Sequence, residues 1–223
     1  MIKKNIYISG ASGFIGSHVV NYLLENTNIN PVLYKKKGRK FKIELNQSPI
    51  LLERSFTKCC IEEVKLFGIE TFVHLKAAGV SQEITPKKLI YENIYKSFLD
   101  LEHAREAGIK KFIITGTFWE YGNAQGNTNQ QLEKAFLDPK NFYSATKIAF
   151  YTIIKQWAKE NNLGVIYIRL PHVFGLGEHH NRLWPSLKRS AYTKTDFHLK
   201  NSEKRIQIAN VQSIAKKISE IAL

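Results

Sequence analysis

The sequence is poor in cysteine and contains no long apolar run. Its 223 residues include two cysteines, and these are adjacent at Cys59 and Cys60, so they do not form the framework of a disulfide-rich secreted domain. No apolar run approaches the roughly 18 residues that a membrane span needs. We therefore expect a protein of the reducing cytoplasm that has no membrane partner.

Acidic residues are also scarce. The chain has 19 Asp and Glu against 33 Lys and Arg, which gives a net charge of +14. Such an excess can indicate an acidic partner such as nucleic acid. The basic residues are spread along the chain, however, and the sequence has neither an aromatic-interleaved ribonucleoprotein motif nor a zinc-ligand spacing. We therefore expect no nucleic-acid partner and no metal, and a basic surface that suits a small anionic substrate.

Short apolar strands alternate with amphipathic helical patterns along most of the chain. Hydrophobic residues make up 43% of the sequence, which is enough for a substantial core. The alternation predicts an α/β fold with a doubly wound parallel sheet and helices on both faces. Strands are expected at residues 6–8, 32–34, 72–75, 112–115 and 165–170, and helices at 17–25, 61–67, 93–107, 142–160 and 211–223.

A glycine-rich turn lies between the first strand and the first helix. Its spacing is GxxGxxG, and its glycines permit a tight turn, a close approach to a pyrophosphate and close packing of the helix on the strand. The N-terminus of the helix offers free N–H groups and the positive end of its dipole to phosphates. The turn therefore predicts a dinucleotide site made by Gly10, Ser12, Gly13, Phe14, Ile15 and Gly16.

The end of the second predicted strand indicates which dinucleotide is preferred. An NAD site usually holds the ribose 2′-hydroxyl with an acidic side chain there, but no Asp or Glu occurs between Glu25 and Glu44. The strand continues instead into Tyr34–Lys40, YKKKGRK, from which Lys35 and Lys36 are expected to pair with a 2′-phosphate. NADP(H) is therefore favoured. NAD(H) stays open as an alternative, because such a run also fits a solvated loop.

Tyr143 and Lys147 are four residues apart in YSATK, so they share one face of the predicted helix. A neighbouring ammonium lowers the pKa of a tyrosine, which can then exchange a proton with a carbonyl or alcohol oxygen. Thr117 adds a hydroxyl at the C-terminal end of a strand, where open α/β sheets build their sites. Asn93 begins the predicted helix before that strand, where it also fits an N-cap.

Together these segments resemble the extended short-chain dehydrogenase/reductases, the NAD-dependent epimerase/dehydratase family. The matching segments are GASGFIG at Gly10, HLKAAG at His74, Asn93, TGTFWEYG at Thr115, YSATK at Tyr143 and RLPHVFGLG at Arg169. The resemblance implies a Rossmann-type NAD(P)-binding domain over residues 1–170. Residues 171–223 would then form a short substrate-binding region, whose completeness the sequence leaves open.

The resemblance also implies roles for individual residues. It makes Thr117, Tyr143 and Lys147 a catalytic triad, with Asn93 supporting a proton-relay water. Tyr143 and Lys147 would also contact the cofactor. Further cofactor contacts are implied for Leu75, Ala77 and the stretch Pro171 to Val173.

The residues after Thr117 discriminate among the reactions of the family. A 4,6-dehydratase has Asp-Glu there, whereas this chain has Phe118 and Trp119, which cannot transfer protons. A 4-epimerase retains bound NAD, which the basic run disfavours. The resemblance therefore favours NADPH-dependent reduction of a 4-keto-6-deoxyhexose linked to CDP or dTDP. A nucleotide-sugar 4-epimerase and a non-catalytic NADP-sensing module are the alternatives.

Substrate contacts are expected from Ser81, Thr117 and Arg182. Arg182 begins RLWPSL, which resembles the nucleotide-sugar-binding stretch of deoxysugar reductases, and a guanidinium suits diphosphate oxygens. Arg182 also fits an ordinary surface residue. The helices of Asn93 and Tyr143 form a four-helix interface in many members of the family, which implies a homodimer.

Overall fold

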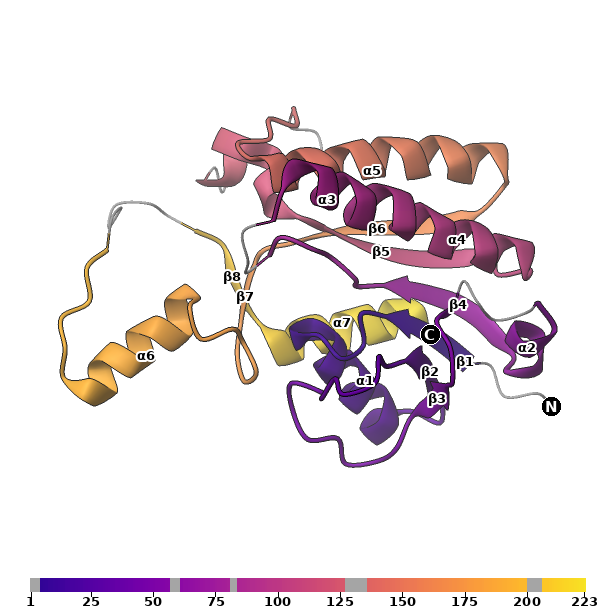
Figure 1. Cartoon of the computed structure of the whole chain (residues 1–223), viewed down its shortest axis with the longest axis horizontal. Coiled ribbons are helices and arrows are strands. Elements are labelled where there is room, and N and C mark those ends of the chain that lie inside the picture. The colour runs from indigo at the N-terminus through magenta and orange to yellow at the C-terminus, as the bar shows by residue number, and fades with distance from the viewer. Residues whose placement is uncertain (1–4, 57–60, 81–83, 127–135, 200–205) are drawn as a thin grey trace.

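A six-stranded parallel sheet forms the centre of the structure, a computed structural model that describes residues 5–56, 61–80, 84–126, 136–199 and 206–223 (Figure 1). The strands are β1 (Asn5–Ser9), β2 (Pro31–Tyr34), β3 (Ile50–Leu52), β4 (Ile69–His74), β5 (Lys111–Thr117) and β6 (Gly164–Leu170). They lie in the order β3-β2-β1-β4-β5-β6, and all neighbours are parallel. This sheet confirms the predicted Rossmann-type fold.

Helices cover both faces of the sheet (Figure 1). They are α1 (Phe14–Asn26), α2 (Ile61–Leu66), α4 (Lys96–Glu106), α5 (Phe142–Glu160) and α7 (Val211–Ala222). On one face α1 and α7 pack together, and Val20 and Ile218 enter the core there. On the other face Leu101 of α4 and Phe150 of α5 are fully buried. All five residues of β1 are buried because both faces are covered, as is usual in a parallel sheet.

The helix before β5 begins earlier than the sequence prediction had it. It runs without interruption through α3 (Pro86–Ile90), the π-helical turn η2 (Tyr91–Tyr95) and α4. Thr85 is its N-cap residue, and Pro86 takes the first helical position, where the missing N–H of proline costs no hydrogen bond. The interpretation of Asn93 as an N-cap is therefore wrong, since Asn93 lies inside η2.

Several short elements were not predicted. After β5 comes the 3-10 helical segment η3 (Phe118–Gly126), and β7 (His172–Phe174) pairs in parallel with β8 (Ile208–Asn210). The helix α6 (Leu183–Thr193) projects away from the sheet in Figure 1, and each of its residues is at least partly exposed. Among the helices that the structure describes, none has both the length and the apolar character needed to cross a membrane. The boundary at residue 170 stays a prediction, although α7 lies on the sheet of the expected first domain.

The packing of α7 can be tested with Ile218→Ala. Ile218 is 1% exposed, so truncation removes buried methylene groups and leaves a cavity. The free energy of unfolding should fall by about 2–5 kcal/mol. As a control, Lys217→Ala changes an exposed side chain of the same helix and should stay within about 0.5 kcal/mol. Urea unfolding followed by circular dichroism measures both variants, and equally small effects would show that α7 is not part of the core.

Candidate active site

The expected site residues gather at the C-terminal edge of the sheet. Because all six strands are parallel, their C-terminal ends meet there. The glycine-rich turn follows β1, the loop 75–80 follows β4, Thr117 ends β5 and Pro171 follows β6. The neighbours of β1 in the sheet are β2 on one side and β4 on the other. The chain therefore changes direction at β1, and this switch point is where open α/β sheets bind their ligands.

The glycine-rich turn has no room for side chains at two of its positions. A Cβ added to Gly10 would lie 2.7 Å from the backbone N of Lys76, and one at Gly16 would lie 2.2 Å from the carbonyl oxygen of Gly10. Gly10 also has a φ of +76°. Within the described residues no side chain caps α1 at Gly13, so its first N–H groups are free for an anion. This cradle fits the pyrophosphate of a dinucleotide.

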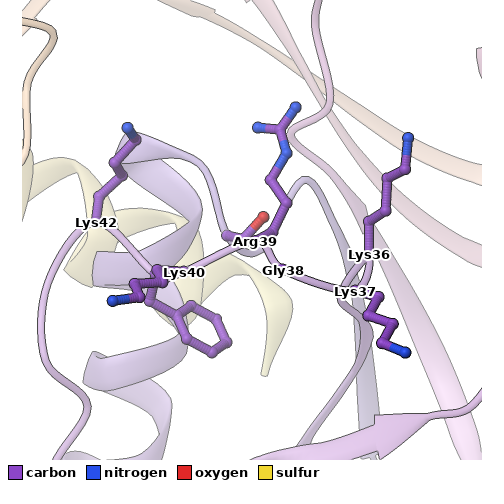
Figure 2. Close-up of a pocket in the computed structure, with 8 residues that line it drawn as sticks. Lys36, Lys37, Gly38, Arg39, Lys40 and Lys42 are labelled. Carbon is purple, nitrogen blue, oxygen red and sulfur yellow. The ribbon is translucent and has the colours of Figure 1, made fainter.

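A hollow of about 590 Å³ lies beside the turn, and we call it the basic hollow. Its lining residues are Ser12, Lys36, Lys37, Gly38, Arg39, Lys40, Phe41 and Lys42. Figure 2 shows the side chains of Lys36, Arg39 and Lys42 extending in the same direction. The backbone N–H of Lys42 donates to Ser17 Oγ at 3.0 Å, which holds this loop against α1. Of the lining residues, Lys37, Arg39, Lys40 and Lys42 were not among the expected cofactor contacts.

Lys35 has a different environment from Lys36. Its amine donates to the carbonyl oxygen of Arg39 at 2.7 Å and lies 5.9 Å from the ring centroid of Phe41. It therefore supports the conformation of its own loop, and it is not among the lining residues. A direct contact of Lys35 with a cofactor phosphate stays a prediction.

Tyr143 and Lys147 lie in the first turns of α5, whose start is well defined. Asn141 Oδ1 accepts from the backbone N–H of Ser144 at 2.8 Å, and the backbone N–H of Asn141 donates to Ser144 Oγ at 3.4 Å. These two hydrogen bonds form a capping box. Lys147 is 2% exposed, and this burial lowers its pKa to about 8. The ammonium is therefore still the main form at neutral pH.

The pKa of Tyr143 shifts in the opposite direction from the one expected. Desolvation raises it well above the usual value, the negative charge of Glu120 raises it further, and the guanidinium of Arg182 lowers it. The expected lowering by the lysine ammonium did not include burial, which disfavours a phenolate. In this structure the phenol keeps its proton at neutral pH.

Asn93 connects the loop after β4 to α5. Its Oδ1 accepts from the N–H of Ala78 at 2.7 Å, and its Nδ2 donates to the Ala78 carbonyl at 3.1 Å and to Thr146 Oγ1 at 3.2 Å. Asn93 is thus connected to the residue that directly precedes Lys147. It lies in the π-helical turn η2, and such turns are frequent at functional sites. The support of a proton-relay water by Asn93 stays a prediction.

Thr117 is buried at the end of β5, and its backbone N–H contacts the carboxylate of Glu120, a residue that the sequence did not point to. The N–H of Thr117 donates to Glu120 Oε1 at 2.8 Å. Glu120 is completely buried, and its other partners are the hydroxyl of Tyr167 and the guanidinium of Arg169. The available signal was a Glu three residues after Thr117 in TGTFWEYG.

An aromatic cluster occupies the two positions after Thr117. The ring centroids of Phe118 and Trp119 are 5.3 Å apart, and His172 of β7 lies 4.8 Å from Phe118 and 5.8 Å from Trp119. Phe118 is 4% exposed. Tightly packed aromatic side chains therefore stand where a dehydratase would present its acid and base.

Arg182 lies at the site and bridges two of its loops. Its Nε pairs with Glu178 Oε1 at 3.2 Å, and its Nη1 donates to the carbonyl oxygen of Val80 at 3.4 Å. Burial and Glu120 raise the pKa of Tyr143, and the Arg182 guanidinium acts in the opposite direction. Ser81, the other expected substrate contact besides Thr117, lies outside the described residues.

Residues 6–208 match the NAD dependent epimerase/dehydratase family. The chain belongs to this family. Its membership confirms the expected relationship to nicotinamide-dependent enzymes of the extended short-chain dehydrogenase/reductase type. The individual roles of Thr117, Tyr143, Lys147 and Asn93 remain predictions supported by their convergence in the structure.

Curated relatives and solved structures agree with this assignment. A trifunctional UDP-glucose 4,6-dehydratase/UDP-4-keto-6-deoxy-D-glucose 3,5-epimerase/UDP-4-keto-L-rhamnose-reductase of Arabidopsis thaliana is 28% identical over 82% of this chain and 29% of its own length. The dTDP-D-glucose 4,6-dehydratase of Mus musculus is 23% identical over 82% of this chain and 54% of its own length. The chain thus spans only part of the length of these relatives.

The fold is shared with solved nucleotide-sugar enzymes. A UDP-glucose 4-epimerase of Thermotoga maritima with UDP-glucose has a TM-score of 0.78 and 23% identity, covering 95% of this chain and 71% of its own. The dTDP-glucose 4,6-dehydratase of Bacillus anthracis in complex with NAD has a TM-score of 0.80 and 19% identity, covering 98% and 71%. At these identities the likeness shows the fold alone.

The burial of Lys147 predicts a pH dependence of stability. Its pKa is about 8 in the folded protein against a usual 10.5, so between these values the unfolded chain binds more protons than the folded one. The free energy of unfolding should therefore rise from about pH 8 to pH 10, by at most about 1.4 kcal/mol per pH unit. Lys147→Met should remove this rise. Urea unfolding at pH 7 and pH 9.5 measures it, and equal changes in both proteins would contradict the assignment.

Proposed function

We propose that the protein reduces the 4-keto group of a nucleotide-linked 4-keto-6-deoxyhexose, a CDP- or dTDP-sugar, with NADPH. The observation that carries this proposal is the combination of Thr117, Tyr143 and Lys147 with the aromatic side chains of Phe118 and Trp119. The first three residues supply the groups for moving a proton at a carbonyl or alcohol oxygen. The aromatic pair supplies no acid or base for a dehydration.

The reaction places a different demand on each residue. A bound reduced nicotinamide supplies the hydride. Tyr143 donates its proton to the carbonyl oxygen of the substrate, and its raised pKa suits this role because the phenol is protonated before the reaction. Thr117 donates a hydrogen bond to the same oxygen. Lys147 is still largely charged at neutral pH, and its ammonium stabilises the phenolate that remains on Tyr143.

The basic hollow supports NADPH as the reductant. It adjoins the glycine-rich turn through Ser12, so a dinucleotide whose pyrophosphate lies at α1 can direct its adenosine ribose into the hollow. Lys36 and Arg39 are the contacts that we propose for the 2′-phosphate. A guanidinium and an ammonium together suit such a group, which carries more than one negative charge.

The substrate diphosphate is assigned to the region of Arg182. The guanidinium there connects the loops that follow β4 and β7, because it pairs with Glu178 and donates to the carbonyl oxygen of Val80. The names of the curated relatives contain UDP- and dTDP-sugars, and one includes a 4-keto-sugar reductase activity. These names support a nucleotide sugar as the substrate class.

We also propose that the protein forms a homodimer through α3, α4 and α5. These helices lie side by side on one face of the sheet (Figure 1). Their outer surface carries large apolar side chains that are at least two-fifths exposed, which is typical of a surface covered by a partner. These side chains are Ile90, Tyr91, Tyr95, Leu99, Phe142 and Ile153.

An assay of NADPH oxidation against a panel of nucleotide 4-ketosugars tests the reaction. We expect one NADPH to be consumed for each sugar reduced. Tyr143→Phe should lower turnover by about 10²–10⁴-fold while it still binds NADPH, because only the proton-donating oxygen is lost. Conversion of a nucleotide hexose without added cofactor would instead establish a 4-epimerase. Binding of NADPH without reaction of any sugar would favour the sensing module.

The cofactor preference is tested by titrating NADPH and NADH. We expect NADPH to bind more tightly than NADH. Lys36→Ala and Arg39→Ala should each reduce the difference between the two binding free energies by about 0.2–1 kcal/mol, as for exposed ion pairs. Lys65→Ala, an exposed lysine on α2, is the matched control and should leave the difference unchanged. Equal affinities for the two cofactors in the unmodified protein would refute the preference.

A further inference from the structure

Glu120 is a completely buried carboxylate directly behind the catalytic residues. Its Oε1 accepts from the Thr117 N–H at 2.8 Å and from the Tyr167 hydroxyl at 2.9 Å, and its Oε2 accepts from Arg169 Nε at 2.6 Å. Both oxygens therefore have hydrogen-bond donors. The partner of Oε2 is a guanidinium, so Glu120 and Arg169 form an ion pair.

The sequence around β5 leaves space for this carboxylate. A Cβ added to Gly116 would lie 2.4 Å from Glu120 Oε1 and 2.5 Å from the hydroxyl oxygen of Tyr167. Gly116 does not have a positive φ, so this space, rather than backbone conformation, accounts for the glycine. A side chain at this position would displace Glu120 from its donors.

Arg169 balances the charge of Glu120 and is itself held firmly. Its guanidinium carbon lies 5.1 Å from the ring centroid of Tyr121, 4.6 Å from that of Tyr151 and 5.3 Å from that of Tyr167. Cation–π contacts of this kind stabilise a desolvated guanidinium. The ion pair therefore keeps one orientation, in which Glu120 lies between Arg169 and the N–H of Thr117.

Glu120 is also connected to the helix that carries the catalytic pair. The Tyr167 hydroxyl lies 2.9 Å from Glu120 Oε1 and 3.2 Å from the backbone carbonyl oxygen of Lys147. Tyr167 is thus in contact with both groups. Its single hydroxyl proton is shared between these two acceptors, so Tyr167 lies between Glu120 and the first turns of α5.

The charge of Glu120 acts on both members of the catalytic pair. It raises the pKa of Tyr143, where Arg182 acts in the opposite direction. It also raises the pKa of Lys147 against the larger effect of desolvation. His74 lies close to Lys147, but its own pKa is lowered well below the usual value, so it is neutral and adds no charge.

We propose that Glu120 is an anionic positioning residue of the catalytic site, which fixes Thr117 through its N–H group, holds α5 through Tyr167 and places negative charge behind Tyr143 and Lys147. The role in reduction rests on the proposed function. The placement of charge does not, so it can be measured without turnover.

The first measurement titrates Lys147 directly. In protein with isotope-labelled lysine, the NMR signal that Lys147→Met lacks belongs to Lys147. Its midpoint, about 8 in the unmodified protein, should move to lower pH in Glu120→Gln, because the charge that opposes desolvation is gone. Glu220→Gln removes an exposed carboxylate that pairs with lysines of α7 and should leave the midpoint in place.

The second measurement follows reduction of a ketosugar by NADPH. Glu120→Gln should lower kcat by up to about 100-fold through misplacement of Thr117 and α5, while NADPH binding is retained. The decrease in kcat at alkaline pH should begin at a lower pH, because Tyr143 and Lys147 both lose their protons more readily. Glu120→Asp keeps the charge and should recover part of the rate.

Glu120→Gln leaves Arg169 without its carboxylate in a largely buried place, which can prevent folding. The double variant Glu120→Gln/Arg169→Gln removes both charges, so its Lys147 midpoint is compared with that of Arg169→Gln, from which it differs only in the charge of Glu120. An unchanged Lys147 midpoint in Glu120→Gln, or the same midpoint in the two Arg169→Gln proteins, would overturn the proposal. A lowered midpoint in a protein that reduces no nucleotide ketosugar would support Glu120 and reject the reductase function.

Discussion

The close approach of backbone at Gly10 and Gly16 is the constraint on which the proposed nucleotide site depends. The turn after β1 lies against the loop after β4 on one side and against α1 on the other, with no space for a Cβ at either contact. This packing aims the free N–H groups of α1 at the switch point of the sheet. The residues that follow β4, β5 and β6 are then brought to the same edge by the parallel arrangement of the strands.

Two kinds of charge are arranged around that edge. The basic hollow is open to solvent, and its cations are available to an anionic ligand. Glu120 and Arg169 are by contrast largely removed from water, where each charge needs a partner, and they are paired with each other. An open basic surface therefore lies beside a buried ion pair.

The segment that begins at Thr117 combines two functions within a few residues. Phe118 packs with His172, whereas Glu120 turns inward to Arg169. The 3-10 helical path of η3 allows neighbouring side chains to point in these different directions. The segment therefore contributes both to the aromatic cluster and to the buried ion pair.

The sequence by itself determined five strands of the six-stranded sheet, the glycine-rich turn, the helix of Tyr143 and Lys147, and the family. These depend on local periodicity and on residues close together in the chain. It did not reveal the full helix before β5 or the short strands β3, β7 and β8, whose few residues carry little periodic signal. Only the tertiary structure decided that Lys35 turns back to its own loop, that burial raises the pKa of Tyr143, and that Glu120 meets Arg169. Each of these depends on contacts or desolvation between segments far apart in sequence, and no local pattern encodes them.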